Sequence, residues 1–114
     1  MKKLFFILIF PISGAVNAQL PESGTYTYSY CYREWHACVN TCTVIINGDS
    51  VTVISNEDQS VPKGEIIDKG ILVQHKSGKW IIAQHPDDKN ARRIGGCGNG
   101  PAIIDFKKKR FKGC

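Results

Sequence analysis

The stretch VIINGDSVTVI, residues 44–54, contains two runs of β-branched residues joined by Asn47-Gly48. β-Branched side chains favour strands, and asparagine and glycine both tolerate the positive φ of a type I′ turn. We therefore predict a β-hairpin with a two-residue loop at Asn47-Gly48. The register that follows pairs Ile46 with Asp49, Val44 with Val51 and Cys42 with Val53. The predicted core face consists of Cys42, Val44, Val51 and Val53.

Residues 71–84 show the same pattern, with Ser77-Gly78 as the predicted turn. This register places His75 beside Trp80 and Val73 beside Ile82 on one face of a second hairpin. Because both faces carry apolar residues, we expect this hairpin to lie near the middle of the sheet. Further strands are expected at residues 65–68 and 102–106.

Residues 85–93 are the one segment with helical signals. Proline stands near the start, Asp87 and Asp88 fall in the first turn, and two arginines fall in the last. Elsewhere strand signals dominate from Thr25 onward, without sustained 3.6-residue periodicity. We therefore predict an all-β fold, a small antiparallel sheet of about six strands that is curled or closed as a barrel, with a short helical turn at residues 87–93.

Residues 1–18 have the features of a secretory signal peptide. They comprise a cationic start at Lys2 and Lys3, an apolar block at residues 4–10 and a small-residue exit at residues 16–18. The apolar block is too short to span a membrane. We therefore expect residues 19–114 to remain after cleavage as a single β domain without a membrane anchor. The predicted location is secreted or periplasmic.

The chain has five cysteines, and all of them lie beyond the predicted signal peptide. A small exported protein usually oxidises its cysteines, because its core alone is thin. With an odd number one thiol is left over, and the sequence leaves every pairing open. Our preferred pairs are Cys97 with Cys114 and Cys31 with Cys38, which leaves Cys42 as a buried thiol. The absence of a Cys-x-x-Cys motif disfavours a redox site.

All four tyrosines occupy alternate positions of one short run. Since a strand repeats every two residues, their rings share one face. That face is either a wall of the core, or an aromatic platform that binds a sugar or a partner protein. The candidate binding residues of this face are Tyr26, Tyr28, Tyr30 and Tyr32.

The second candidate binding surface is a basic run near the C-terminus. The run could dock on an anionic surface or a partner protein, since clustered charge raises the local potential. Equally, it could be a charged edge strand whose lysines oppose aggregation. Removal of residues 1–18 takes away two lysines and lowers the net charge from +5 to 13 − 10 = +3, which is too mild to indicate a dedicated nucleic-acid binder. The candidate residues are Lys107, Lys108, Lys109 and Arg110.

No assembled catalytic or metal-ligating set is evident. The three histidines lack ligand spacing, and we therefore expect no metal and no cofactor. The glycine-rich residues 95–101 lack the strand, helix and lysine of a phosphate-binding loop, so we interpret them as a tight turn around Cys97. A cysteine-dependent enzyme that uses Cys97 with His75 or His85 is the less favoured alternative.

The Gly-x-Tyr opening at residues 24–26, followed by successive antiparallel hairpins, resembles the start of small calycin-type barrels. The resemblance covers three residues and a topology, and it implies a barrel but no particular site residue. We predict a small, exported, non-catalytic binding protein. A protein-directed role, such as inhibition of a secreted hydrolase, is one form of this prediction, and a calycin-like barrel that binds a small molecule is the alternative.

Overall fold

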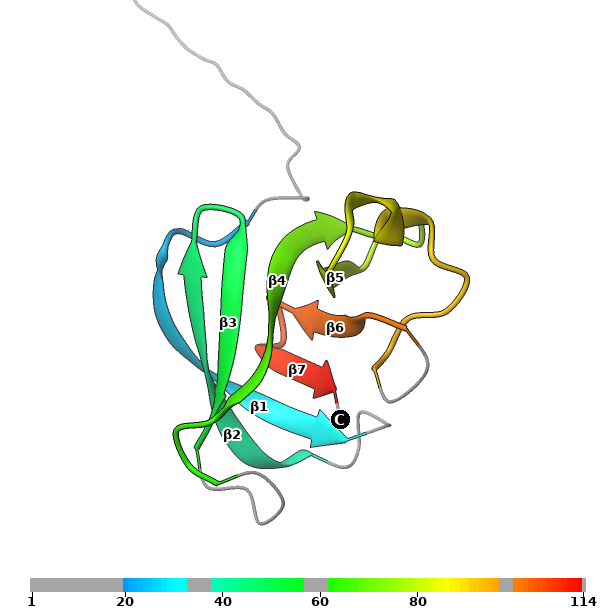
Figure 1. Ribbon diagram of the computed structural model, residues 1–114. Helices are drawn as coiled ribbons and strands as arrows, with labels where there is room; N and C mark the ends of the chain where they lie inside the picture. The colour runs from blue at the N-terminus through cyan, green and yellow to red at the C-terminus, as the bar shows by residue number, and fades with distance from the viewer. Residues whose placement is uncertain (1–19, 33–37, 57–61, 97–99, 114) are drawn as a thin grey trace, which may run out of the picture.

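The computed structural model describes residues 20–32, 38–56, 62–96 and 100–113, which form a seven-stranded closed β-barrel (Figure 1). Neighbours in the chain pair antiparallel, and a parallel pairing of the last strand with the first closes the barrel. The strands are β1 (Gly24–Tyr32), β2 (Cys38–Asn47), β3 (Ser50–Ser55), β4 (Ile66–Gln74), β5 (Trp80–Ala83), β6 (Ala102–Asp105) and β7 (Arg110–Gly113). The predicted all-β barrel is confirmed. The predicted helical turn is the short 3₁₀-helix η2 (Pro86–Asn90).

The seventh strand arises from residues that the sequence analysis assigned to a basic run. In β7 the ring of Phe111 is fully buried, whereas its neighbours Arg110 and Lys112 are only partly buried. Phe111 lies opposite Ile104 of β6 and opposite Tyr30 of β1. Its ring centroid is 5.6 Å from that of Tyr30. One buried aromatic residue between two cations therefore closes the barrel.

The first hairpin has the predicted core face, but its turn is one residue further along. Residues Cys42, Val44, Val51 and Val53 are all at most 2% exposed. The observed pairs are Ile46 with Val51, Val44 with Val53 and Cys42 with Ser55. The loop is thus Gly48-Asp49, and Gly48 has a φ of 66°. A positive φ confined to the first loop position is the pattern of a type II′ turn, so the predicted I′ turn is wrong. The register moves by two, which preserves the side-chain faces.

The second hairpin has a register that differs by one residue from the prediction. Its loop has three residues, because the His75 N–H donates to the Lys79 carbonyl at 2.8 Å. Gly78 takes the left-handed position of this loop with a φ of 97°. A shift of one residue exchanges the two faces of a strand. Trp80 consequently lies opposite Gln74 rather than beside His75, and Leu72 and Ile82 face the core.

Both faces of β5 are buried, as expected for a strand in the middle of the sheet. Ile81 and Ala83 are at most 1% exposed but do not belong to the cluster inside the barrel. The helix η2 packs against β4 and β5. Two hydrogen bonds hold this segment: the Lys76 N–H donates to the Lys89 carbonyl at 2.9 Å, and His75 Nε2 lies 2.7 Å from the Ala91 carbonyl.

A single bent strand, β4, replaces the two separate strands expected at residues 65–68 and 71–76. It pairs with β3 along its first part and with β5 along its second, and Figure 1 shows it curving across the molecule. Gly70 stands at this crossing, where a Cβ atom would overlap the carbonyl oxygen of Ala83. Glycine at a barrel corner permits this close approach of two backbones.

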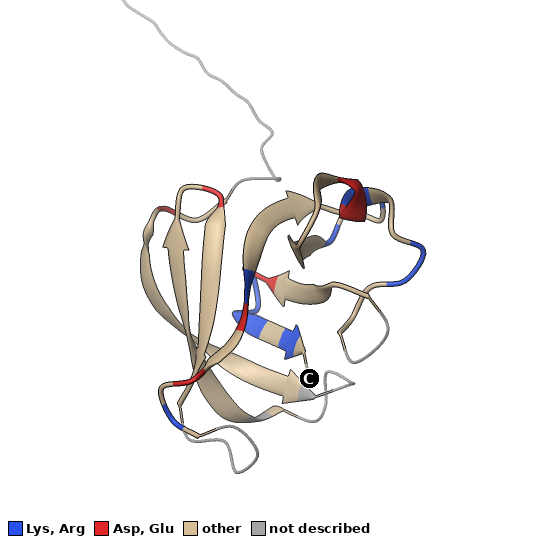
Figure 2. Ribbon diagram, in the orientation of Figure 1, with Lys and Arg blue, Asp and Glu red and all other residues tan. Residues whose placement is uncertain are grey.

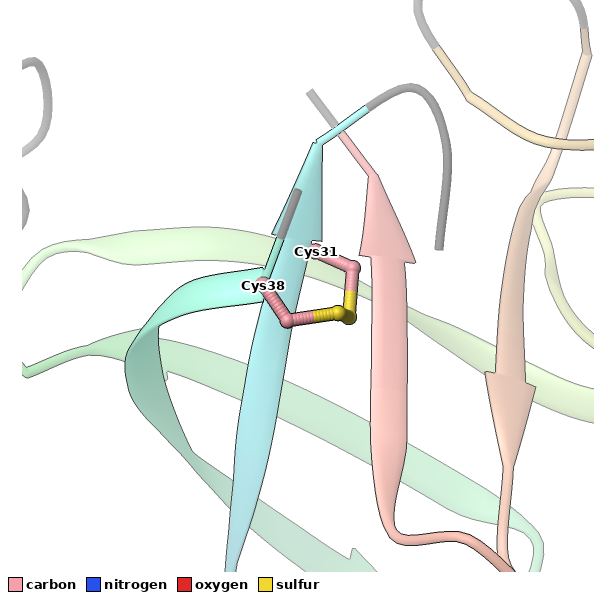
Figure 3. The surroundings of a disulfide bond; sticks show 2 residues. All are labelled: Cys31 and Cys38. Atoms are coloured by element: carbon pink, nitrogen blue, oxygen red, sulfur yellow. A yellow bond between two sulfur atoms is a disulfide. The ribbon is translucent and has the colours of Figure 1, made fainter. Parts of the chain in front are cut away.

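The disulfide between Cys31 and Cys38 is confirmed, and it joins the end of β1 to the start of β2 (Figure 3). Disulfides persist in non-reducing compartments. Cys42 is a free, buried thiol, as predicted. The predicted partners Cys97 and Cys114, like the predicted signal peptide, lie outside the described residues. Within the described part of the chain, no helix has the length and apolar composition needed to cross a membrane.

The close approach of the two backbones at Gly70 predicts that even a small side chain there lowers the stability of the fold. We expect Gly70→Ala to lower the free energy of unfolding by about 1–3 kcal/mol, because the added methyl group must push β4 from β5. Gly24→Ala is the matched control, since a Cβ there meets its nearest atoms at an ordinary 3.7 Å. Urea denaturation of the two variants measures the difference, and equal stability would contradict the tight crossing.

Candidate functional site

A pocket of about 590 Å³ opens at one end of the barrel, where β4 and β6 begin and β5 and β7 end. Its apolar lining consists of inward-facing side chains from three strands: Ile82 of β5, Ala102 of β6 and Phe111 of β7. All three belong to the core cluster and are nearly inaccessible. Ile67 of β4 adds a partly buried side chain. The apolar surface that a ligand could touch is therefore that of Ile67 and of Pro101, another partly buried lining residue, and the three core side chains lie behind it.

One wall of the pocket carries a half-buried carboxylate, Asp68 of β4. Asp68 lies opposite Val53 in the ladder, so it follows the inward-facing positions of the sheet. Its Oδ1 accepts a hydrogen bond of 2.8 Å from the Lys69 N–H. Burial raises the pKa of Asp68 above its ordinary value of 3.8, although this hydrogen bond acts in the opposite direction.

The facing wall is the segment that leaves β5, with Gln84, His85 and Asp88 as its polar groups. Pro86 begins the 3₁₀-helix, and Asp88 Oδ2 accepts the N–H groups of Gln84 at 2.9 Å and of His85 at 3.2 Å. The Gln84 side chain donates to the Lys69 carbonyl at 2.8 Å and so links the two walls. These contacts hold two carboxylates and an imidazole around one opening.

The third wall comes from the described ends of the glycine-rich segment, which are hydrogen-bonded to each other. The Gly95 and Gly96 N–H groups donate to the Pro101 and Gly100 carbonyls at 2.7 and 3.0 Å. Gly100 has a φ of 93°, and a Cβ atom there would overlap the Arg93 carbonyl. Only glycine fits such a position without strain. Cys97 itself lies outside the described residues, so the alternative of a cysteine nucleophile stays untested.

The tyrosine run lines the interior of the barrel. Tyr28 and Tyr30 are 4% and 0% exposed, so these two rings form a core wall rather than an outward platform. Burial is the main reason that the pKa of Tyr28 is raised to about 12, which keeps its hydroxyl neutral. Tyr26 is partly buried, and the side chain of Tyr32 lies outside the described residues.

Aromatic side chains fill the barrel at the end away from the pocket. Phe106 lies 6.4 Å from the ring of Tyr28 and 6.0 Å from that of Trp80, and Tyr26 packs edge-on against Tyr28. Leu20 also packs against this core. Such edge-to-face contacts produce dense packing. The barrel is consequently filled at this end and hollowed at the other.

The basic run forms the turn between β6 and β7 (Figure 2). Lys107 and Lys108 donate their backbone N–H groups to Asp105 Oδ1 at 3.0 and 2.9 Å, and Lys109 has a φ of 58°. The three lysine side chains are exposed. Because β7 pairs on both sides, Arg110 does not lie on an edge strand, and the interpretation of the run as edge protection is wrong.

Asp68 and Gln84 were not among the predicted site residues, whereas His85 was named only as a possible partner of Cys97 and Asp88 only as an acid in the first helical turn. The signal for Asp68 is its alternation with Leu72, which places a carboxylate on the inward face of the strand. Among the described residues, no group of three or more histidine, cysteine or acidic side chains could hold a metal ion. The chain matches no protein-family model, no curated protein and no solved structure.

The raised pKa of Asp68 predicts that the stability of the fold depends on pH. The pKa of Asp68 is higher in the folded than in the unfolded state, so the native state binds the proton more tightly. The free energy of unfolding therefore decreases as the pH rises from the unfolded pKa to the folded pKa. We expect Asp68→Asn to be more stable than the wild type at pH 7 and to lose this advantage below pH 3.8. Asp49→Asn, at an exposed turn position, is the control. Thermal unfolding across this pH range measures both, and a less stable Asp68→Asn at pH 7 would contradict the argument.

Cys42 is expected to be chemically inert in the native protein. Burial raises the pKa of its thiol from 9.0 to about 12, which lowers the thiolate fraction about a thousandfold at neutral pH. Iodoacetamide should therefore leave Cys42 unlabelled until denaturant is added, as peptide mass spectrometry would show. Rapid labelling of Cys42 in the native state would disprove its burial.

Proposed function

We propose that this protein is a non-catalytic binding protein that takes a small molecule into the open end of its barrel. The single observation that supports the proposal is the pocket of about 590 Å³ over the apolar core. Ligand sites typically enclose about 300–1,000 Å³ and combine an apolar lining with a few polar groups. Ile67 and Pro101 supply the accessible apolar lining here, and Asp68, Gln84 and His85 supply the polar groups.

The arrangement of the two ends of the barrel indicates where a ligand would enter. Tyr28, Trp80 and Phe106 pack together at the end away from the pocket. A ligand would therefore enter between β4 and the segment around η2, where polar side chains surround the opening. An apolar part could rest on Ile67 and Pro101, while its polar end remains beside Asp68 and His85. This division matches a ligand with one apolar and one polar end.

A protein-directed role is the second candidate, and the exposed turn between β6 and β7 favours it. Three consecutive lysines project from this turn, and clustered positive charge accelerates association with an acidic partner. The turn connects β6 to β7, and both strands also line the pocket. One small barrel could therefore bind both a small molecule and a partner protein.

Two exposed glutamines provide a matched test of the pocket. Gln84 lines the pocket and donates to the Lys69 carbonyl, while Gln74 lies outside its lining and donates to the Gly78 carbonyl. We expect Gln84→Trp to obstruct the opening and to weaken binding of the neutral fluorescent probe N-phenyl-1-naphthylamine about tenfold. Gln74→Trp should leave binding unchanged.

Fluorescence titration of the probe distinguishes the possible outcomes. Loss of binding in Gln74→Trp alone would place the ligand at the opposite end of the barrel and contradict the proposal. Failure of the wild-type protein to bind this probe or any other amphiphile would leave the protein-directed role as the better account.

A further inference from the structure

The charges around the pocket are opposite in sign to the charge of the whole protein. The chain carries a formal net charge of +5. Among the described residues that line the pocket, however, the charged side chains are the carboxylates Asp68 and Asp88, and His85 is the remaining titratable group. No lysine or arginine belongs to this described lining. A concave site with charges of one sign concentrates the field of those charges.

The two carboxylates approach the opening from different parts of the fold. Asp68 belongs to β4, whereas Asp88 belongs to η2 beyond β5. Backbone N–H groups engage Oδ1 of Asp68 and Oδ2 of Asp88. Within the described residues, neither carboxylate forms an ion pair with a lysine or an arginine. Their negative charge is therefore available to a group that enters the pocket.

The half-buried carboxylate of Asp68 lowers the stability of the fold, and the fold does not require a charged side chain at this position. Asp68 shares the pocket lining with apolar side chains, and burial makes its ionisation less favourable. Asparagine would keep the hydrogen bond from the Lys69 N–H without a buried charge. Residues that oppose stability in this way are concentrated at functional sites.

We propose that the pocket selects an organic cation, a molecule with an ammonium or amidinium group and an apolar body. The inference rests on the proposed function and specifies its ligand class. The cationic group would lie between Asp68 and Asp88, where charge-assisted hydrogen bonds are available, and the apolar body would lie against Ile67 and Pro101, the partly exposed apolar residues of the lining. An anionic ligand would face two like charges there and lose affinity.

A series of three probes with one apolar body tests the charge preference. Octylamine, octanol and octanoate differ in charge at pH 7 but share their chain length. Two-dimensional NMR titration of the wild-type protein gives the affinity of each probe from the amide shifts of Ile82, Ala102 and Phe111. We expect octylamine to bind roughly tenfold more tightly than octanol, and octanoate to bind most weakly.

Two variants assign the preference to Asp68. Asp68→Asn should weaken octylamine roughly tenfold and leave octanol unchanged, while Asp49→Asn, at a turn away from the pocket, should change neither. Octanol binding as tightly as octylamine, or octylamine indifferent to Asp68→Asn, would overturn the cation preference but keep the pocket. If no probe shifts the pocket amides, the proposed function fails, and the ligand class fails with it. The order of the three probe affinities for the wild-type protein tests the cation preference even if a variant fails to fold.

Discussion

The structure depends on the parallel pairing of β1 with β7, because this pairing converts a curled sheet into a closed barrel. Tyr30 and Phe111 lie opposite each other in that pairing and are both fully buried. Without it, β1 and β7 would each expose a row of unpaired backbone groups. The other inward-facing side chains would also lose their far wall. The core, the aromatic packing and the pocket therefore all require this one contact between the two ends of the chain.

The sequence predicted the fold class well, because β-branched alternation is a local signal. The core face of the first hairpin followed directly from Val44 and Val53 and their neighbours. The turns were predicted less well, because the position of a positive φ decides the register. Asn47-Gly48 and Ser77-Gly78 looked alike, yet the first hairpin turns at Gly48-Asp49, while the second places glycine at the end of a three-residue loop.

The strand β7 escaped prediction for a different reason. It contributes one buried apolar side chain, Phe111, and the surrounding cations conceal the alternation. The pocket was equally hidden from local patterns, since its polar groups come from β4 and from the segment after β5. Asp68 and Asp88 are twenty positions apart in the chain, and the pairing of β4 with β5 brings them to one opening. Tyr26, Tyr28 and Tyr30, by contrast, share one face as predicted, and closure determined that this face points inward.

The outer layer formed by η2 differs in kind from the other pocket walls. Strands β4, β5, β6 and β7 are held by continuous ladders, but η2 is attached to the second hairpin by hydrogen bonds at Lys89 and Ala91. Insertions or deletions in this layer leave every ladder intact, so they place little burden on folding. Evolution can thus reshape one side of the opening while the barrel is conserved. Related chains with this architecture should diverge most in length between β5 and β6, and with it in the molecules that they accept.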